Sequence, residues 1–262
     1  MFNTYIFDLY GTLVDIRTDE ESWDLWSKMS LLYQYQGANY TPEELKTAFE
    51  QAVKQAFDKV TALDADKSLE KKTEADANIN LALIKREIQI EYVYQGLFQD
   101  KGIEVSLTSC IQLAQIFRAL STKYVKLYKG AIELLQALKA KNKKVYLLSN
   151  AQAVFTKGEL ELLGLLPYFD GIALSSDIGF MKPDSRFYQY LLETYQIDPS
   201  TAIMIGNDYN SDTVGGSQVG LHTCYINSNL SPKEDADRIA DMEADFVLER
   251  MDLERVKQLI LV

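Results

Sequence analysis

Six short runs of apolar, β-favouring residues recur along the chain, with helical patterns between them. The runs are residues 5–7, 145–148, 172–174, 202–205, 224–226 and 246–248. An alternation of such strands with helices is typical of a parallel sheet that is covered by helices on both faces. The sequence therefore predicts an α/β fold whose core is a Rossmann-like, doubly wound parallel sheet.

A long stretch with a helical period separates the first run from the second. Leu45, Phe49, Val53 and Phe57 recur at four-residue spacing after the helix-start sequence Thr-Pro-Glu-Glu, which is typical of a helix with one buried face. We therefore predict an inserted α-helical domain over residues 16–126 and a core made of residues 1–15 and 127–262. The polar stretch 64–76 is predicted to be an exposed connector.

Charge and residue usage exclude several classes of function. The net charge of -11 disfavours nucleic acid as a partner, because binding to the phosphate backbone needs a basic patch. With one histidine, His222, the chain has to draw its catalytic groups mostly from carboxylates, hydroxyls and lysine. The two distant cysteines predict no disulfide, and no stretch has the length of a membrane span or the pattern of a secretory signal. We therefore expect a cytoplasmic protein with no membrane partner.

Polar residues follow the predicted strands at four places. They are Asp8 in a glycine-containing turn, the pair Ser149 and Asn150, Lys182 before a proline, and the segment 206–212 with Asp208 and Asp212. In parallel α/β sheets the ligand site lies beyond the carboxyl ends of the strands. Taken singly, each also has an ordinary structural interpretation as a turn residue, a helix cap or a solvated charge.

Taken together, the four segments resemble the ordered motif set of the haloacid dehalogenase-like superfamily. Residues 6–13 meet its first motif, hhhDxDGTL, and residues 147–150 meet its Ser/Thr motif. Lys182 with Pro183 meets the lysine motif, and residues 206–212 meet the acidic motif. The helical insertion directly after the first motif is similar to the mobile cap of that family. The resemblance therefore implies a hydrolase with an inserted α-helical cap domain.

The resemblance implies nucleophilic catalysis. Asp8 would attack the substrate to form an ester or an acyl phosphate, which water then hydrolyses. Ser149 would hydrogen-bond an oxygen of the transferring group, and Lys182 would offset the negative charge there. Asn150, just before a helical pattern that starts near Ala151, adds a further substrate-binding position, because free backbone amides at a helix start can bind an anion.

The resemblance also implies a magnesium ion and a small phosphorylated metabolite as substrate. The ligands of Mg²⁺ would be the Asp8 carboxylate, the backbone carbonyl of Tyr10, and Asp208, Asp212 or both. Arg17, Arg86 and Arg118 are candidates for contacts with the rest of the substrate. The sequence leaves the substrate and the oligomeric state open.

Two positions depart from the phosphatase pattern of the family. Tyr10 stands where phosphatases carry a second aspartate, and its phenol can donate a proton but is a poor general base at neutral pH. Asn207 replaces the first aspartate of the acidic motif. Tyrosine at the first position resembles the 2-haloacid dehalogenases of the superfamily, which do not use a metal.

Three functions therefore stay open, with a Mg²⁺-dependent phosphatase favoured. The second is a metal-independent 2-haloacid dehalogenase, in which Trp23 and Trp26 would line an apolar halide pocket. Against it, no arginine lies between Arg17 and Arg86 to seat the halide, and the acidic segment is richer in carboxylates than that reaction needs. The third is a catalytically slow member that binds a phosphorylated metabolite or a partner protein.

Overall fold

The core of the molecule is a six-stranded, wholly parallel sheet. The computed structural model describes residues 2–70 and 85–261. Its sheet consists of β1 (Thr4–Phe7), β4 (Lys144–Ser149), β5 (Gly171–Leu174), β6 (Ala202–Gly206), β7 (His222–Ile226) and β8 (Phe246–Leu248). The strand order is β5-β4-β1-β6-β7-β8, so β1 lies in the middle. All six predicted runs are strands of this sheet.

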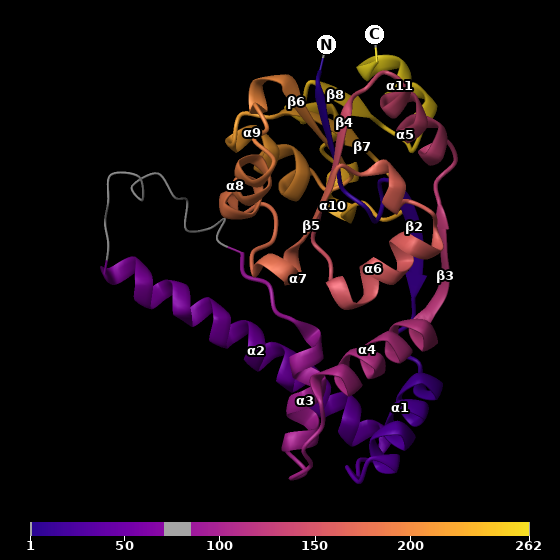
Figure 1. Cartoon of the computed structure of the whole chain (residues 1–262), viewed down its shortest axis with the longest axis vertical. Coiled ribbons are helices and arrows are strands. Elements are labelled where there is room, and N and C mark those ends of the chain that lie inside the picture. Colours follow the sequence, from indigo (N-terminus) through magenta and orange to yellow (C-terminus); the bar gives the residue numbers. More distant parts are fainter. Residues whose placement is uncertain (1, 71–84, 262) are drawn as a thin grey trace.

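Helices cover both faces of the sheet, as the alternation of buried residues in β1 illustrates. Tyr5 and Phe7 face the apolar cluster that includes α5 (Ala131–Ala140), α6 (Ala153–Leu162) and α11 (Leu253–Ile260). Ile6 points to the opposite cluster, which includes α8 (Ser185–Thr194). The predicted α/β fold with a doubly wound parallel sheet is confirmed (Figure 1).

Short helical segments complete the loops of the core. They are α7 (Ser175–Ile178), α9 (Gly215–Gln218), α10 (Lys233–Ala236), a π-helix over Tyr209–Val214, and 3₁₀ turns at Leu166–Tyr168, Pro199–Thr201 and Ile239–Asp241. In the part of the chain that the structure describes, no helix is both long and apolar enough to cross a bilayer.

Four helices inserted after β1 form a separate helical unit with its own core. They are α1 (Trp23–Tyr35), α2 (Pro42–Glu70), α3 (Ile90–Gln99) and α4 (Leu107–Ser121). Their buried centre is largely aromatic, because Tyr33 stacks on Phe98 at 4.2 Å between ring centroids and Phe117 packs on Phe49. Thr41 and Glu44 form the predicted capping box at the start of α2.

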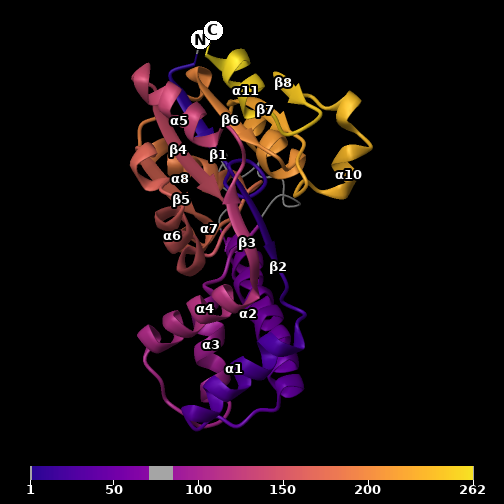
Figure 2. The same cartoon turned by 90° about the vertical axis from the view of Figure 1, so that its right-hand side faces the viewer.

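A two-stranded antiparallel ribbon joins the helical unit to the core (Figure 2). It consists of β2 (Val14–Thr18) and β3 (Thr122–Leu127), with a register shift between Arg17 and Thr18. The ribbon occupies both ends of the predicted insertion and was not anticipated. Its strands alternate polar and apolar residues over short lengths, a signal that is easily lost beside longer helical patterns.

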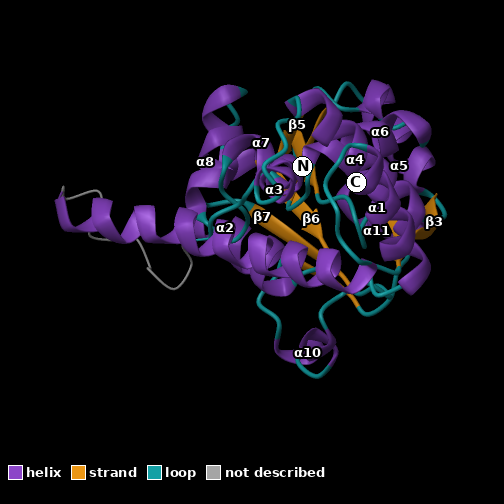
Figure 3. Cartoon of the chain, turned by 90° about the horizontal axis from the view of Figure 1, so that it is seen from below, coloured by secondary structure: helices purple, strands orange, loops and turns teal. Residues whose placement is uncertain are grey.

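The connector predicted over residues 64–76 was wrong for its first half. Helix α2 continues to Glu70, and the remainder of the stretch lies outside the described residues. Residues 64–70 contain neither glycine nor proline and include several good helix formers, so the helix has no reason to stop there. In the view from below, α2 runs out past the edge of the core (Figure 3).

Candidate active site

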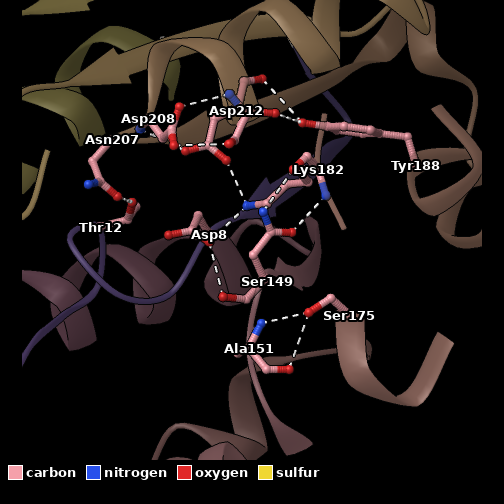
Figure 4. Close-up of polar contacts among 12 residues, drawn as sticks. Asp8, Thr12, Ser149, Ala151, Ser175, Lys182, Tyr188, Asn207, Asp208 and Asp212 are labelled. Atoms are coloured by element: carbon pink, nitrogen blue, oxygen red, sulfur yellow. Dashed lines mark hydrogen bonds and ion pairs between the residues drawn. The ribbon is translucent and has the colours of Figure 1, made fainter. Parts of the chain in front are cut away.

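The carboxyl ends of the parallel strands face the helical unit, and the predicted site residues gather there (Figure 2). Asp8 directly follows β1, Ser149 is the last residue of β4, and Asn207 follows β6. Lys182 comes from the loop between α7 and α8. Because β1, β4 and β6 are neighbours in the sheet, residues far apart in sequence meet at one edge (Figure 4).

Lys182 is the centre of the cluster. Its Nζ donates to Asp8 Oδ1 at 2.8 Å and to Asp212 Oδ1 at 2.7 Å, and all three residues are buried. A buried charge is tolerated when it is paired and hydrogen-bonded. Burial lowers the pKa of Lys182, but the carboxylates of Asp212 and Asp8 outweigh that effect and raise the pKa overall. The lysine therefore stays an ammonium ion at neutral pH.

The two oxygens of Asp8 have different surroundings. Oδ1 accepts hydrogen bonds from Lys182 Nζ and from the hydroxyl of Ser149, the latter at 3.0 Å. Oδ2 makes no hydrogen bond with any described residue, and in Figure 4 it points away from Lys182. One oxygen of the carboxylate is thus held in place while the other is available to a ligand.

Asn150 holds the loop that carries Lys182. Its Nδ2 donates to the Lys182 carbonyl at 2.9 Å, and its Oδ1 accepts from the Lys182 backbone N–H at 2.7 Å. Both polar atoms of this side chain are therefore engaged with the backbone of the lysine. Asn150 was predicted to bind substrate; its side chain holds the backbone of Lys182, and the residue also lines the pocket that contains Asp8.

The acidic segment lies across the pocket from Ser149. Asp208 caps the π-helix, because its two oxygens accept from the backbone N–H and the hydroxyl of Ser211 at 2.8 and 2.9 Å. Asp212 points back into the site, where Oδ2 accepts from the backbone N–H of Asp208 at 3.0 Å. Burial raises the pKa of Asp212, and the ammonium of Lys182 opposes this rise.

Two glycines of the motifs make room for these side chains. A Cβ at Gly206 would lie 2.1 Å from Asp212 Oδ2, so only glycine lets the carboxylate approach the end of β6. A Cβ at Gly11 would lie 2.3 Å from Asn207 Nδ2, and Gly11 also has a positive φ of 87°. Asn207 in turn accepts a hydrogen bond from Thr12 at 3.2 Å. Its amide therefore ties the turn after β1 to the loop after β6.

Two neighbouring cavities, which share three lining residues, lie at this edge of the sheet. The strand-end pocket, of about 180 Å³, is lined by Asp8, Ser149, Lys182, Asn207, Asp208 and Asp212, among others. The interdomain cavity, of about 630 Å³, lies between the core and the helical unit and is lined by Ile16, Arg17, Thr18, Glu87, Arg118, Gln152, Phe155 and Thr156, among others. Tyr10, Asn150 and Leu230 line both cavities and so form the boundary between them.

The phenol of Tyr10 is turned away from Asp8. Its hydroxyl donates to Glu159 and lies 3.0 Å from the hydroxyl of Thr156, both on α6. Burial raises the pKa of Tyr10, as does Glu159, while Arg118 opposes the rise. The hydroxyl therefore stays protonated at neutral pH.

Glu159 is a residue that the sequence analysis missed. It lies on α6 with Ala153, Thr156 and Leu160, the other buried residues of that helix. A glutamate on the buried face of an amphipathic helix needs a partner, and that expectation was the available signal. The partner is Arg118 on α4, whose Nε donates to Glu159 at 2.6 Å.

The remaining candidates from the sequence fall into two groups. Arg17 and Arg118 line the interdomain cavity, whereas Arg86 lies over the ring of Phe180 at 4.4 Å and lines neither cavity. The halide pocket predicted from two tryptophans is wrong: Trp23 is 66% exposed, and Trp26 packs inside the helical unit. Although the two tryptophans are three residues apart on α1, one side chain lies on the surface and the other in the core of the helical unit.

The donor atoms around the free Asp8 oxygen fit a hard cation. Among the described residues, no three acidic, histidine or cysteine side chains are grouped closely enough to form a metal cage by themselves. The oxygens of Asp8, Asp208 and Asp212 nevertheless line one pocket with Tyr10. Mg²⁺ prefers such oxygen ligands and commonly keeps several of its waters, so it needs few protein carboxylates.

A parallel α/β core with polar residues near its strand ends and a helical insertion after β1 defines the Rossmann-like class of folds with an inserted helical unit. The chain belongs to the haloacid dehalogenase-like hydrolase family, whose model matches residues 2–220.

Curated relatives of the chain include phosphatases. The pyrimidine 5'-nucleotidase YjjG of Escherichia coli is 35% identical over 38% of this chain and 44% of its own length. The glyceraldehyde 3-phosphate phosphatase of Methanothermobacter thermautotrophicus is 30% identical over 37% of this chain and 43% of its own length. The chain thus spans about half the length, or less, of these relatives.

A solved structure extends the similarity in fold to the whole chain. The structure of the 2-haloacid dehalogenase of Pseudomonas syringae pv. Tomato DC3000 aligns over 100% of this chain and 100% of its own length. The TM-score is 0.64 and the sequence identity is 20%. At that identity the likeness concerns the fold.

Proposed function

We propose that the protein is a Mg²⁺-dependent phosphatase that hydrolyses a small phosphate monoester through Asp8. The observation that carries this proposal is the asymmetry of the Asp8 carboxylate. One of its oxygens is held by Lys182 and Ser149, and the other is free in a pocket that Asp208 and Asp212 also line. A fixed nucleophile with one free oxygen, beside a buried ammonium ion, suits attack on an anionic group.

In the proposed reaction, Asp8 Oδ2 attacks phosphorus and the bond from phosphorus to the ester oxygen breaks. This gives an aspartyl phosphate and an alkoxide, which takes a proton from solvent and leaves as the alcohol. Water then attacks phosphorus and releases inorganic phosphate, so Asp8 is regenerated. The hydroxyl of Ser149 and the ammonium of Lys182 lie beside the attacking carboxylate, where they would stabilise the charge on the phosphoryl oxygens. Asn150 would act through Lys182, because it holds the lysine backbone.

The proposed ligands of Mg²⁺ are the Asp8 carboxylate, the Tyr10 carbonyl and Asp208, with water completing the shell. When bound, the ion would offset the negative charge of the phosphoryl group. Asp212 is already engaged by Lys182 and by the backbone of Asp208. Its proposed contribution is therefore to fix the lysine and the acidic loop, with direct metal binding as a further role.

The helical unit is proposed to act as a cap whose inner face, with the core, encloses the leaving part of the substrate. The interdomain cavity of about 630 Å³ opens beside the strand-end pocket and has room for a small alcohol or sugar. The curated relatives named above, a nucleotidase and a phosphatase of a three-carbon sugar phosphate, support a small phosphorylated metabolite.

A dehalogenase is the second candidate, and Tyr10 is the observation that favours it. Halide departure requires no proton, and the Tyr10 hydroxyl is engaged by Glu159 rather than aimed at Asp8. Against this candidate, neither tryptophan reaches the cavities, and two further carboxylates line the strand-end pocket. A catalytically slow, ligand-binding member of the family is the third candidate. Only a measurement of turnover distinguishes it from the two enzymes.

The test compares two substrates under two metal conditions. Phosphate release from p-nitrophenyl phosphate is measured with Mg²⁺ and with a chelator, and chloride release from 2-chloropropanoate is measured in the same two buffers. The proposal expects phosphate release that needs Mg²⁺ and Asp8. Chloride release that persists in the chelator would favour the dehalogenase, and turnover of neither substrate above the Asp8→Asn variant would favour the binding protein.

A further inference from the structure

Arg118, which lines the interdomain cavity, is paired with a glutamate of the core, Glu159. Arg118 on α4 donates through Nε to Glu159 Oε1 at 2.6 Å and through Nη2 to Glu159 Oε2 at 3.4 Å. The side chains are only 17% and 11% exposed. Two-point contacts of this kind between arginine and a carboxylate are among the stronger ion pairs, because the guanidinium geometry matches the two oxygens.

Glu159 is also fixed from the core side. It accepts a hydrogen bond from the hydroxyl of Tyr10, which itself lies 3.0 Å from Thr156. The guanidinium of Arg118 lies over the rings of Phe155 and Tyr10, at 5.3 and 5.6 Å from their centroids. Both groups of the pair are therefore held in place, and the charge of Arg118 is already matched by a fixed partner.

The other two charged residues that line the cavity, Arg17 and Glu87, carry charges of opposite sign. Arg17 on β2 is exposed at the cavity and Glu87 lies on its wall, where its carboxylate accepts from Ser175 at 2.8 Å. With Arg118 matched by Glu159, the cavity offers an incoming ligand no excess of positive charge. Its apolar surface comes from Ile16, Phe155 and Leu230, among others.

We infer that Glu159 is a specificity-determining residue: its ion pair with Arg118 neutralises the guanidinium, so that Arg118 does not bind an anionic group of the substrate. The cavity then accepts phosphate esters whose leaving group is neutral and partly apolar, and it discriminates against leaving groups that carry a second anion. This inference rests on the proposed phosphatase function, because it assigns the interdomain cavity to the leaving group. Glu159 acts through Arg118 and Tyr10 and needs no contact with the reacting atoms.

Two phosphonates that differ by one charge test the inference by binding, independently of turnover. Butylphosphonate and 3-carboxypropylphosphonate are titrated calorimetrically into the wild-type protein with Mg²⁺. We expect the dissociation constant of the carboxylated ligand to be no lower than that of the alkyl ligand. In Glu159→Gln the amide can still accept from Tyr10, but Arg118 is released from its ion pair. The carboxylated ligand should then gain about tenfold in relative affinity, as expected for one new charge-assisted contact.

Two further variants control this result. Arg118→Met combined with Glu159→Gln should abolish the gain, because the released cation is gone. Glu161→Gln, an exposed change on the same helix, should behave as wild type.

Three outcomes would overturn the inference. They are a lower dissociation constant of the wild type for the carboxylated ligand than for the alkyl ligand, a folded Glu159→Gln that shows no gain, and binding of neither phosphonate. The wild-type comparison stands even if Glu159→Gln does not fold. Turnover of p-nitrophenyl phosphate that depends on Asp8 would leave the proposed function in place in each of these cases, and its absence would refute that function separately.

Discussion

Lys182 donates to Asp212 at 2.7 Å, and this contact is as short as the one that Lys182 makes to the proposed nucleophile. Asp212 thus belongs to the charge balance of the buried lysine. A loss of its carboxylate would leave Lys182 with Asp8 as its one remaining anionic contact among the described side chains.

Asp212→Ala is therefore expected to destabilise the protein strongly. Removing one partner of a buried ion pair typically costs about 3–5 kcal/mol when the other charge is left uncompensated. Because Asp8 still contacts Lys182, we expect a cost of about 3 kcal/mol, at the lower end of that range. The measurement is the free energy of unfolding from urea titration, with the exposed Asp237→Asn as control. A change below about 1 kcal/mol, within the usual range for surface pairs, would show that the pair is not buried in solution.

Asp8→Asn is expected to abolish turnover while the fold is retained, because the amide keeps the shape of the carboxylate but is a far weaker nucleophile. We expect kcat for p-nitrophenyl phosphate to fall by about 10³-fold or more. Circular dichroism and the melting temperature serve as the check on folding. Unchanged kcat in the folded variant would refute Asp8 as the nucleophile.

Ser149→Ala and Lys182→Met are expected to lower kcat through the loss of charge stabilisation at phosphorus. Removal of one such donor typically costs about 10²–10³-fold in kcat. Ser149→Ala should do so with little change in stability, because only one hydrogen bond to Asp8 is lost. Full activity of both variants would mean that these side chains do not contact the transferring group.

Tyr10→Phe tests whether the Tyr10 hydroxyl has a structural role or acts as the general acid. Since the Tyr10 hydroxyl is bound to Glu159 and Thr156, we expect kcat for an alkyl phosphate to change by less than about threefold, whereas loss of a general acid costs about 10²–10⁴-fold. Tyr10→Asp restores the aspartate that phosphatases of the family carry and should raise kcat for the same substrate. A large loss in Tyr10→Phe would assign the proton transfer to this phenol.

Gly206→Ala is expected to disturb the site by a purely steric route. The added Cβ would lie 2.1 Å from Asp212 Oδ2, so the carboxylate would have to leave its contact with Lys182 or the end of β6 would have to shift. Overpacking of this kind costs about 1–3 kcal/mol. The readouts are the melting temperature and kcat, with Gly158→Ala, where a Cβ meets nothing within 4 Å, as the matched control.

The sheet was predictable from sequence because a buried parallel strand is a short, continuous apolar run with a marked boundary. Residues 5–7 and 202–205 are such runs, and a polar residue follows each strand at the edge where ligands bind. Asp8 and Ser149 were singled out for that reason. Lys182 lies in the loop between α7 and α8 and Asp212 lies in the π-helix after β6, so these two were singled out by the order of the family motifs rather than by a strand end.

The contacts that the sequence did not indicate all depend on the packing of distant elements. Glu159 is paired by an arginine from α4, and Asn150 is engaged by the loop of Lys182. Trp23 and Trp26 share a helix, yet one is exposed and the other buried. Local patterns identify the residue types, but the partner of a side chain is decided by tertiary structure.

The β2–β3 ribbon has a mechanical consequence for the two units that it connects. The hydrogen bonds of an antiparallel pair run across the strands, so a ribbon twists and bends far more easily than it stretches or shears. Other contacts also cross between the units: the Met181 N–H donates to the Lys85 carbonyl at 3.0 Å, and Arg118 on α4 is paired with Glu159 on α6. We therefore expect that a tilt of the helical unit over the strand ends would require the Arg118–Glu159 pair and the Met181–Lys85 bond to break, while the ribbon keeps the two units connected.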